Sequence, residues 1–273
     1  MVAIGLSIAR IGSGWCGCGG LFNVGPVKEL STRLLGTDLG SPHGVTTQAK
    51  WVHQLWHVTF WFAVPIGLLV LGLILWCVFR YRVKAGAERK PEQFQYHIPI
   101  EAAYTIIPLV IVAIVFGFMY NAENKVDSVS KNPDIRITVE GFQWGWRFDY
   151  PNGHIQVGTV ANELDINSEN NLPVLVIPTQ KTVQLHVVSL DVVHTFYVPE
   201  FLFQRDMIPG VDNTFDINVT TPGVYPGQCN NICGEYHAYM RFLVDAMPPS
   251  EFDTWYSQQA PGSITTAGEP SKS

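Results

Sequence analysis

The chain has 273 residues, of which 47% are hydrophobic and 15% are charged, and its mean hydropathy is +0.13. This length is enough for one sizeable domain and an additional segment. The positive mean hydropathy argues against a wholly water-soluble protein. The net charge is −6, and we expect no nucleic-acid partner.

Residues 1–50 are interpreted as a signal or lead-in segment. The first twenty residues are Gly-rich and weakly apolar, as in the remnant of a signal peptide. Cys18 follows Gly17, and a small residue before a cysteine is typical of a lipoprotein processing site, although Trp15 fits that pattern poorly. Cleavage or lipidation at Cys16 or Cys18 therefore stays open.

Residues 51–122 are predicted to form a transmembrane helical hairpin. No charged residue occurs from Leu55 to Phe79 or from Ala102 to Tyr120, and each run is about long enough to cross a bilayer. Pro65 and Pro108 lie inside these runs, which membrane helices tolerate better than soluble helices do. A pair of buried core helices is the alternative, and the length and apolar character of both runs argue against it.

The loop between the two runs carries five basic residues, and such loops stay in the cytoplasm. Both ends of the chain are therefore expected outside the cell membrane, on the periplasmic side in a bacterium. From Asn121 to the C-terminus the chain has 8 Lys or Arg and 18 Asp or Glu, so its acidity belongs to this outer part. The basic residues of the loop are Arg80, Arg82, Lys84, Arg89 and Lys90.

From Ile135 onward, long apolar runs give way to short alternating ones. The segment IRITVEGFQWGWRFDY alternates apolar and polar residues, and further short β-branched and aromatic runs follow, separated by Pro-Gly and Asn-Gly turns. Many short strands at such spacing predict a small all-β sandwich or barrel over residues 123–258. Residues 259–273 are rich in Gly, Ser, Thr and Pro, and we expect a disordered tail.

Five side chains with metal affinity occur in this β-domain. Thiolate and thioether are soft ligands and imidazole is borderline, which selects copper or zinc over calcium or magnesium. A methionine in the set favours copper, because zinc sites use Cys, His and carboxylate. A mononuclear blue-copper site needs one Cys, whereas two thiolates can bridge two copper ions. The five residues are His194, Cys229, Cys233, His237 and Met240.

Each of these residues also has a plainer interpretation. Cys229 and Cys233 could form a disulfide outside the cell, or a Cys2His2 set could hold structural zinc. Met240 could belong to the core. The presence of five soft or borderline ligands in one domain argues against all of these together.

The pattern as a whole resembles one known family. A helical hairpin followed by a β-domain with G-Q-C-x-x-I-C-G-x-x-H-x-x-M is similar to subunit II of haem-copper cytochrome c oxidase, over about residues 45–255. The segments EAAYTIIP, QWGW at 143–146 and DMIPG at 206–210 strengthen the resemblance. It implies a cupredoxin-like domain whose five soft ligands hold a dinuclear copper centre.

The resemblance also assigns a role to the residue between the two cysteines. In the family this residue gives a backbone carbonyl to one copper, and here it is Asn231. The family usually has Glu at this position, whose side chain also reaches a Mg or Mn ion at the interface with subunit I. Asn231 lacks the carboxylate, so the resemblance leaves that ion open, with Asp206 in the same region.

Three further roles follow from the resemblance alone. Trp144 matches the tryptophan through which cytochrome c delivers its electron, although Phe142 stands where the family more often has His. Asp191 matches a carboxylate at which the cytochrome docks. Glu101 matches the mouth of a proton pathway into subunit I, and it equally suits a helix N-terminus as a simple carboxylate.

The resemblance implies that a c-type cytochrome, soluble or tethered to a bc-type complex, reduces the copper centre. The electron then passes to the haem of subunit I, where oxygen is reduced to water and protons are pumped, within a complex that includes other oxidase subunits and membrane lipid. The alternatives are a membrane-anchored copper carrier outside an oxidase, a quinol oxidase subunit, which lacks the copper ligands, and a zinc-stabilised module.

Overall fold

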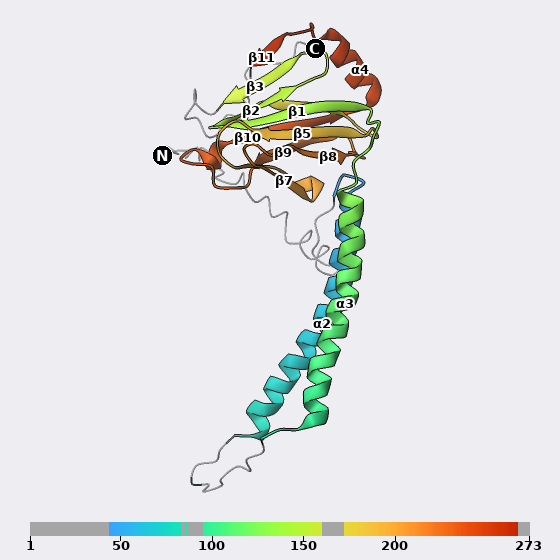
Figure 1. Cartoon of the computed structure of the whole chain (residues 1–273), viewed down its shortest axis with the longest axis vertical. Helices are drawn as coiled ribbons and strands as arrows, with labels where there is room; N and C mark the ends of the chain where they lie inside the picture. The colour runs from blue at the N-terminus through green and yellow to red at the C-terminus, as the bar shows by residue number, and fades with distance from the viewer. Residues whose placement is uncertain (1–43, 83–85, 87–94, 160–171, 267–273) are drawn as a thin grey trace, which may run out of the picture. The chain divides into compact units, whose positions relative to one another are not determined.

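The computed structural model describes residues 44–82, 86, 95–159 and 172–266. Two long helices come first, α2 (Ala49–Arg80) and α3 (Ile98–Val126), and they pack against each other. Both have long apolar central stretches, and no residue of their most hydrophobic windows is buried, as expected for side chains that face lipid. Figure 1 shows the two helices side by side. Cys16, Cys18, Lys84, Arg89 and Lys90 lie outside the described residues.

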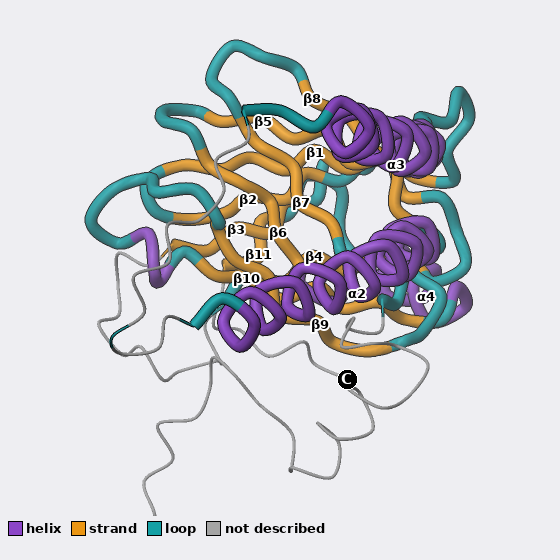
Figure 2. Tube along the Cα trace, turned by 90° about the horizontal axis from the view of Figure 1, so that it is seen from below, coloured by secondary structure: helices purple, strands orange, loops and turns teal. Residues whose placement is uncertain are grey.

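The rest of the described chain folds into two sheets that face each other. One sheet has the strand order β11-β3-β2-β1-β5-β8, and the other has the order β4-β10-β9-β6-β7. Figure 2 shows the strands in orange. The strand bounds are β1 Ile135–Phe142, β2 Gly145–Asp149, β3 Ile155–Thr159, β4 Val174–Pro178, β5 Val183–Ser189, β6 His194–Val198, β7 Phe203–Met207, β8 Asn213–Ile217, β9 Gly223–Cys229, β10 Arg241–Met247 and β11 Ile264–Thr266.

The core lies between the sheets because inward-facing side chains alternate along the strands. In β10, for example, Phe242, Val244 and Ala246 are buried, while the residues between them are more exposed. The ring of Phe242 packs at a tilt against those of Trp146 and Phe196, at centroid distances of 4.7 and 4.9 Å. Short helices η3 (Pro199–Phe201), η4 (His237–Tyr239) and α4 (Pro249–Gln258) complete the domain.

The C-terminal segment corrects one expectation. Residues Ile264–Thr266 form β11, which pairs in parallel with β3, where the composition suggested a disordered tail from residue 259. The pairing follows from a contact just before the strand, since the His154 ring bonds to both the hydroxyl and the carbonyl of Ser263. Residues 267–273 lie outside the described part.

Candidate metal centre

The candidate ligands meet where two antiparallel strands share an end. β6 begins at His194 and β9 ends near it at Cys229, in a register that pairs Phe196 with Cys229. Residues 230–239 then form a loop that leads into β10. The loop is closed by a hydrogen bond from the backbone N of Cys229 to the carbonyl of Met240, 2.9 Å long. The sheet therefore fixes both ends of the ligand loop.

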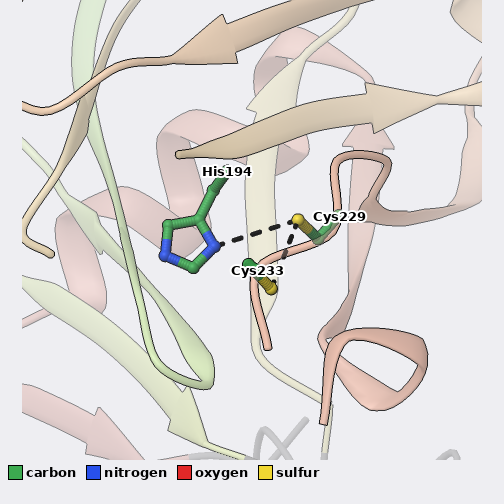
Figure 3. A group of neighbouring side chains, drawn as sticks. All are labelled: His194, Cys229 and Cys233. Atoms are coloured by element: carbon green, nitrogen blue, oxygen red, sulfur yellow. Dashed lines mark hydrogen bonds between the residues drawn. The ribbon is translucent and has the colours of Figure 1, made fainter. Parts of the chain in front are cut away.

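The five side chains form one connected cluster, with the two cysteine sulfurs at its centre. Cys229 Sγ lies 3.8 Å from His194 Nδ1 and 3.8 Å from Cys233 Sγ. Cys233 Sγ lies 3.6 Å from His237 Nδ1 and 3.8 Å from Met240 Sδ. Figure 3 shows His194 and the two cysteines turned toward one another. Each cysteine sulfur thus lies beside an imidazole nitrogen.

This donor set fits soft metal ions. Two thiolates that each lie about 2.3 Å from one ion can be at most about 4.6 Å apart, and the observed separation of the Cys229 and Cys233 sulfurs is 3.8 Å. A disulfide would need a separation of about 2.05 Å, and both cysteines are free thiols. The backbone O of Asn231 also faces the site, 3.2 Å from Cys229 Sγ.

The two buried thiols have pKa values that are shifted in opposite directions. Both side chains are buried, at 3% exposure. Burial alone would raise the pKa of Cys229, but hydrogen bonds with His194, with the backbone of Asn231 and Thr195 and with His237 outweigh it and lower that pKa to about 6. Burial and the neighbouring Cys229 charge raise the pKa of Cys233. Two adjacent thiolates in this buried site would therefore be stabilised by a bound cation.

A carboxylate holds the outer side of the His194 ring. Asp191 Oδ1 lies 2.8 Å from His194 Nε2, and Asp191 Oδ2 accepts the backbone N–H of Gln143 at 2.7 Å. The backbone N of Val192 donates to the same carboxylate at 2.6 Å. Burial would raise the pKa of Asp191, but these hydrogen bonds lower it overall. With Nε2 engaged, Nδ1 of His194 is the nitrogen that faces the thiols.

The two tryptophans of QWGW have different environments. Trp146 on β2 is fully buried in the core, and its Nε1 donates to the carbonyl of Met240 at 3.3 Å. Trp144 lies in the tight turn between β1 and β2, half-buried against the ligand loop, with its ring edge-on to that of Tyr236 at 4.9 Å. The turn therefore places the two rings differently, whereas two such residues within one strand would share a face.

The remaining predicted residues lie away from the thiols. Asp206 on β7 is exposed, and its Oδ1 accepts a hydrogen bond from Thr195 at 2.6 Å. Glu101 lies in the first turn of α3, and its Oε1 accepts the backbone N–H of His97 at 2.7 Å. This bond is what a carboxylate at a helix N-terminus provides. The docking role of Asp191 and the proton-pathway role of Glu101 stay predictions.

Sequence reasoning missed two residues at the site. Gln143 Nε2 donates to the carbonyl of Cys233 at 2.7 Å, across 90 positions of sequence. Gly234 has a φ of +126° and lies directly beneath the Trp144 ring. The position of Asp191, three residues before His194, is a sequence signal for their contact. The hydrogen bond of Gln143 gives no such signal, because its acceptor is a backbone carbonyl.

Comparison with known proteins agrees with this geometry. Residues 36–119 match the transmembrane domain of cytochrome c oxidase subunit II, and residues 135–247 match its periplasmic domain. A probable cytochrome c oxidase subunit 2 from Nocardia farcinica is 31% identical over 279 residues, covering 82% of this chain and 74% of that protein. The counterpart from Streptomyces avermitilis is 34% identical over 245 residues, covering 78% and 76%.

Among solved structures, the periplasmic domain of subunit II of cytochrome oxidase from Bradyrhizobium japonicum is 28% identical. The match covers 48% of this chain and 96% of that one, with a TM-score of 0.41. Two apolar helices followed by a β-sandwich, and a Cys-His cluster in that sandwich, are found together with two matching family domains. The chain therefore belongs to the cytochrome c oxidase subunit II family and is a membrane-bound subunit of the haem-copper oxidase complex.

Proposed function

We propose that this subunit accepts electrons one at a time from a c-type cytochrome at a centre of two copper ions and passes them to the haem of subunit I. One observation carries the proposal: two buried thiols lie 3.8 Å apart, with one imidazole beside each and a thioether at the end. A mononuclear cupredoxin site needs one Cys. The second Cys supports a pair of ions bridged by two thiolates.

The residues that would hold copper fall into three kinds. The two cysteines would bridge the ions, one imidazole would bind each ion, and the thioether and a backbone carbonyl would be the weak ligands. When bound, the copper pair would take up one electron at a time and pass it on. The bridging cysteines would be Cys229 and Cys233, and the imidazoles would be those of His194 and His237. The weak ligands would be the thioether of Met240 and the backbone carbonyl of Asn231.

The protein contributes rigidity and exclusion of water. His194 and Met240 have no exposed surface, and the Asp191 carboxylate fixes the His194 ring. The Cys229 to Met240 backbone bond joins the two ends of the ligand loop, where β9 ends and β10 begins. Ligands that cannot move keep the reorganisation on reduction small, which speeds electron transfer in both directions.

The route of the electron is part of the same proposal. Trp144 lies against the ligand loop and would receive the electron from the cytochrome. The acidic outer domain would attract a basic cytochrome, with a rate that falls as salt rises. Asp191 is the docking carboxylate that the family match suggests, and Glu101 would mark the mouth of a proton pathway in subunit I. The basic loop between the helices supports a position of the β-domain on the outer, periplasmic face of the cell membrane.

A second metal ion at the subunit I interface fits these residues poorly. Mg²⁺ and Mn²⁺ prefer several oxygen ligands, carboxylates above all. Asn231 offers no carboxylate, and one oxygen of Asp206 is engaged by Thr195. No step of the proposed function therefore passes through such an ion. Metal analysis of the intact complex, with the spectrum of Mn²⁺ as a marker, would detect one.

The proposed bridging role of the cysteines has a direct test in the full-length chain. Cys229→Ser and Cys233→Ser should each abolish the shared-electron spectrum and lower copper from two ions per chain to one or none, because a hydroxyl is a poor soft ligand. Cys77→Ser is the matched control, since Cys77 is exposed on α2, far along the chain from the site. Copper content by atomic absorption and the electron paramagnetic resonance spectrum would be measured. Two coppers and an unchanged spectrum in either ligand variant would refute the bridging role.

A further inference from the structure

The turn between β1 and β2 reaches across to the ligand loop. Phe142 pairs with Gly145, so Gln143 and Trp144 are the two turn residues. The side-chain amide of Gln143 donates from Nε2 to the carbonyl of Cys233 at 2.7 Å. The turn is thus bonded to the backbone of a copper ligand.

The same turn is bonded to the second ligand segment. The backbone N–H of Gln143 donates to Asp191 Oδ2 at 2.7 Å, and Asp191 Oδ1 lies 2.8 Å from His194 Nε2. Gln143 therefore contacts the Cys233 side of the site through its side chain and the His194 side through its backbone. Among the described residues, it joins the segments that carry both.

Trp144 is held by packing alone. Its Nε1 is buried and has no hydrogen-bond partner among the described residues, and its ring rests edge-on against Tyr236 at 4.9 Å. A Cβ on Gly234 would lie 3.0 Å from Trp144 Cζ2 and 3.1 Å from Gln143 Nε2. The ring and the amide therefore occupy the space that a side chain at 234 would need. The position of Trp144 depends on its neighbour Gln143 and on the bare backbone of Gly234.

From this arrangement we infer that Gln143 is a positioning residue for electron uptake: its amide, bonded to the Cys233 carbonyl beside Gly234, fixes Trp144 against the Cys233 side of the copper centre. The inference rests on the proposed role of Trp144 as the residue that receives the electron. Gln143 binds no metal and meets no substrate in this role. It sets the distance between the indole and the ligand backbone, and electron transfer slows as that distance grows.

The test compares variants of the full-length subunit in the assembled oxidase. Gln143→Leu removes the donor, and Gln143→Glu keeps the size but sets an acceptor against the Cys233 carbonyl. Gln143→Leu should keep two coppers and an unchanged KM for a reduced c-type cytochrome, while the limiting rate of electron uptake falls below that of the wild type. Gln143→Glu should keep two coppers and lower the limiting rate in the same way. Gln258→Leu, an exposed glutamine on α4, is the substitution control and should match the wild type.

A readout without copper accompanies the rates. In the metal-free full-length chain, hydrogen–deuterium exchange of residues 230–240 should be faster in Gln143→Leu than in the wild type, because the Cys233 carbonyl loses its bond to the turn. Gly234→Ala should lower the limiting rate in the same way by displacing the indole. Gly262→Ala controls for the strain of a positive φ, since Gly262 has φ +72° and nothing within 4 Å of the added Cβ.

The outcomes separate the inference from the function on which it rests. Trp144→Gln should also lower the limiting rate while copper stays bound. If Trp144→Gln is slow and Gln143→Leu matches the wild type in rate and exchange, the positioning role is wrong and the role of Trp144 stands. If Trp144→Gln matches the wild type, the proposed uptake route is wrong and the positioning role falls with it. Loss of copper from Gln143→Leu would overturn the inference in favour of a purely structural role.

Discussion

At the residue scale, Asp191 has two interpretations that the structure brings into competition. The family match suggests a docking site for the cytochrome, yet the carboxylate already contacts His194 and accepts two backbone N–H groups. A carboxylate that orients a ligating imidazole typically accounts for 10–100-fold in metal affinity. We therefore predict that Asp191→Ala weakens copper binding by about this factor, even at salt concentrations that screen docking.

The matched control for Asp191 is the surface pair of Asp212 and His186, whose atoms lie 3.3 Å apart. Asp212→Ala removes a similar contact from an exposed position and should leave copper affinity unchanged. Affinity would be measured by competition with a copper chelator at high salt. Wild-type affinity in Asp191→Ala, with slower reduction by cytochrome only at low salt, would show that docking is its sole role.

The candidate ligands could be proposed from sequence because their chemistry is local. Soft side chains at Cys229, Cys233, His237 and Met240 lie within twelve positions, and few other functions need that set. Gln143 was not predictable in this way. Its partner is a backbone carbonyl brought near by the fold, and any residue at 233 would supply one.

At the scale of elements, the helices and the β-domain were predictable from periodicity, whereas β11 was not. Charge-free runs of membrane length and alternating β-branched runs leave clear patterns. The segment Ile264–Thr266 has only three residues, and it forms a strand because β3 offers an open edge and His154 holds Ser263 beside it. Such tertiary contacts override composition.

His154 makes the attachment of β11 sensitive to pH. A carbonyl can only accept a hydrogen bond, so the bond to the Ser263 carbonyl assigns the proton to Nδ1. Nε2 is then an unprotonated nitrogen, buried and without a partner among the described residues. Burial lowers the pKa of His154, opposed by the Ser263 bond. The unfolded chain takes up a proton below about pH 6.5, where the folded chain resists it.

The resulting prediction concerns stability between about pH 7.5 and 5. The contribution of His154 to the free energy of unfolding is fully present above about pH 6.5 and is lost as the pH falls below that value. His154→Asn keeps a group near the Nδ1 position and cannot be charged, so the fall in melting temperature toward low pH should be shallower. Thermal unfolding of the full chain at several pH values measures this, with His186→Asn as the exposed control. A fall as steep as that of the wild type would contradict the assignment.

At the scale of the whole molecule, both ends of the helical hairpin are bonded to the strand β8 or the residues just after it. Gln48, at the start of α2, donates to the backbone O of Asp216 and accepts the backbone N–H of Asn218. After α3, the backbone N of Ser130 donates to the Asp216 carboxylate at 2.5 Å. Asp127 forms an ion pair with Arg205 at 2.6 Å. These bonds connect both ends of the helical hairpin to the β-domain, which suits the proposed transfer of electrons to a fixed partner in the membrane.

The number and kind of metal ions in the wild-type chain test the central claim most directly. Full-length protein, purified without chelators and reconstituted with copper, would be analysed for copper and zinc and examined by electron paramagnetic resonance. Two thiolates between two ions predict two coppers per chain and a spectrum in which one unpaired electron is shared equally by both. One zinc per chain with no colour, or one copper with the spectrum of an isolated ion, would contradict the two-copper centre.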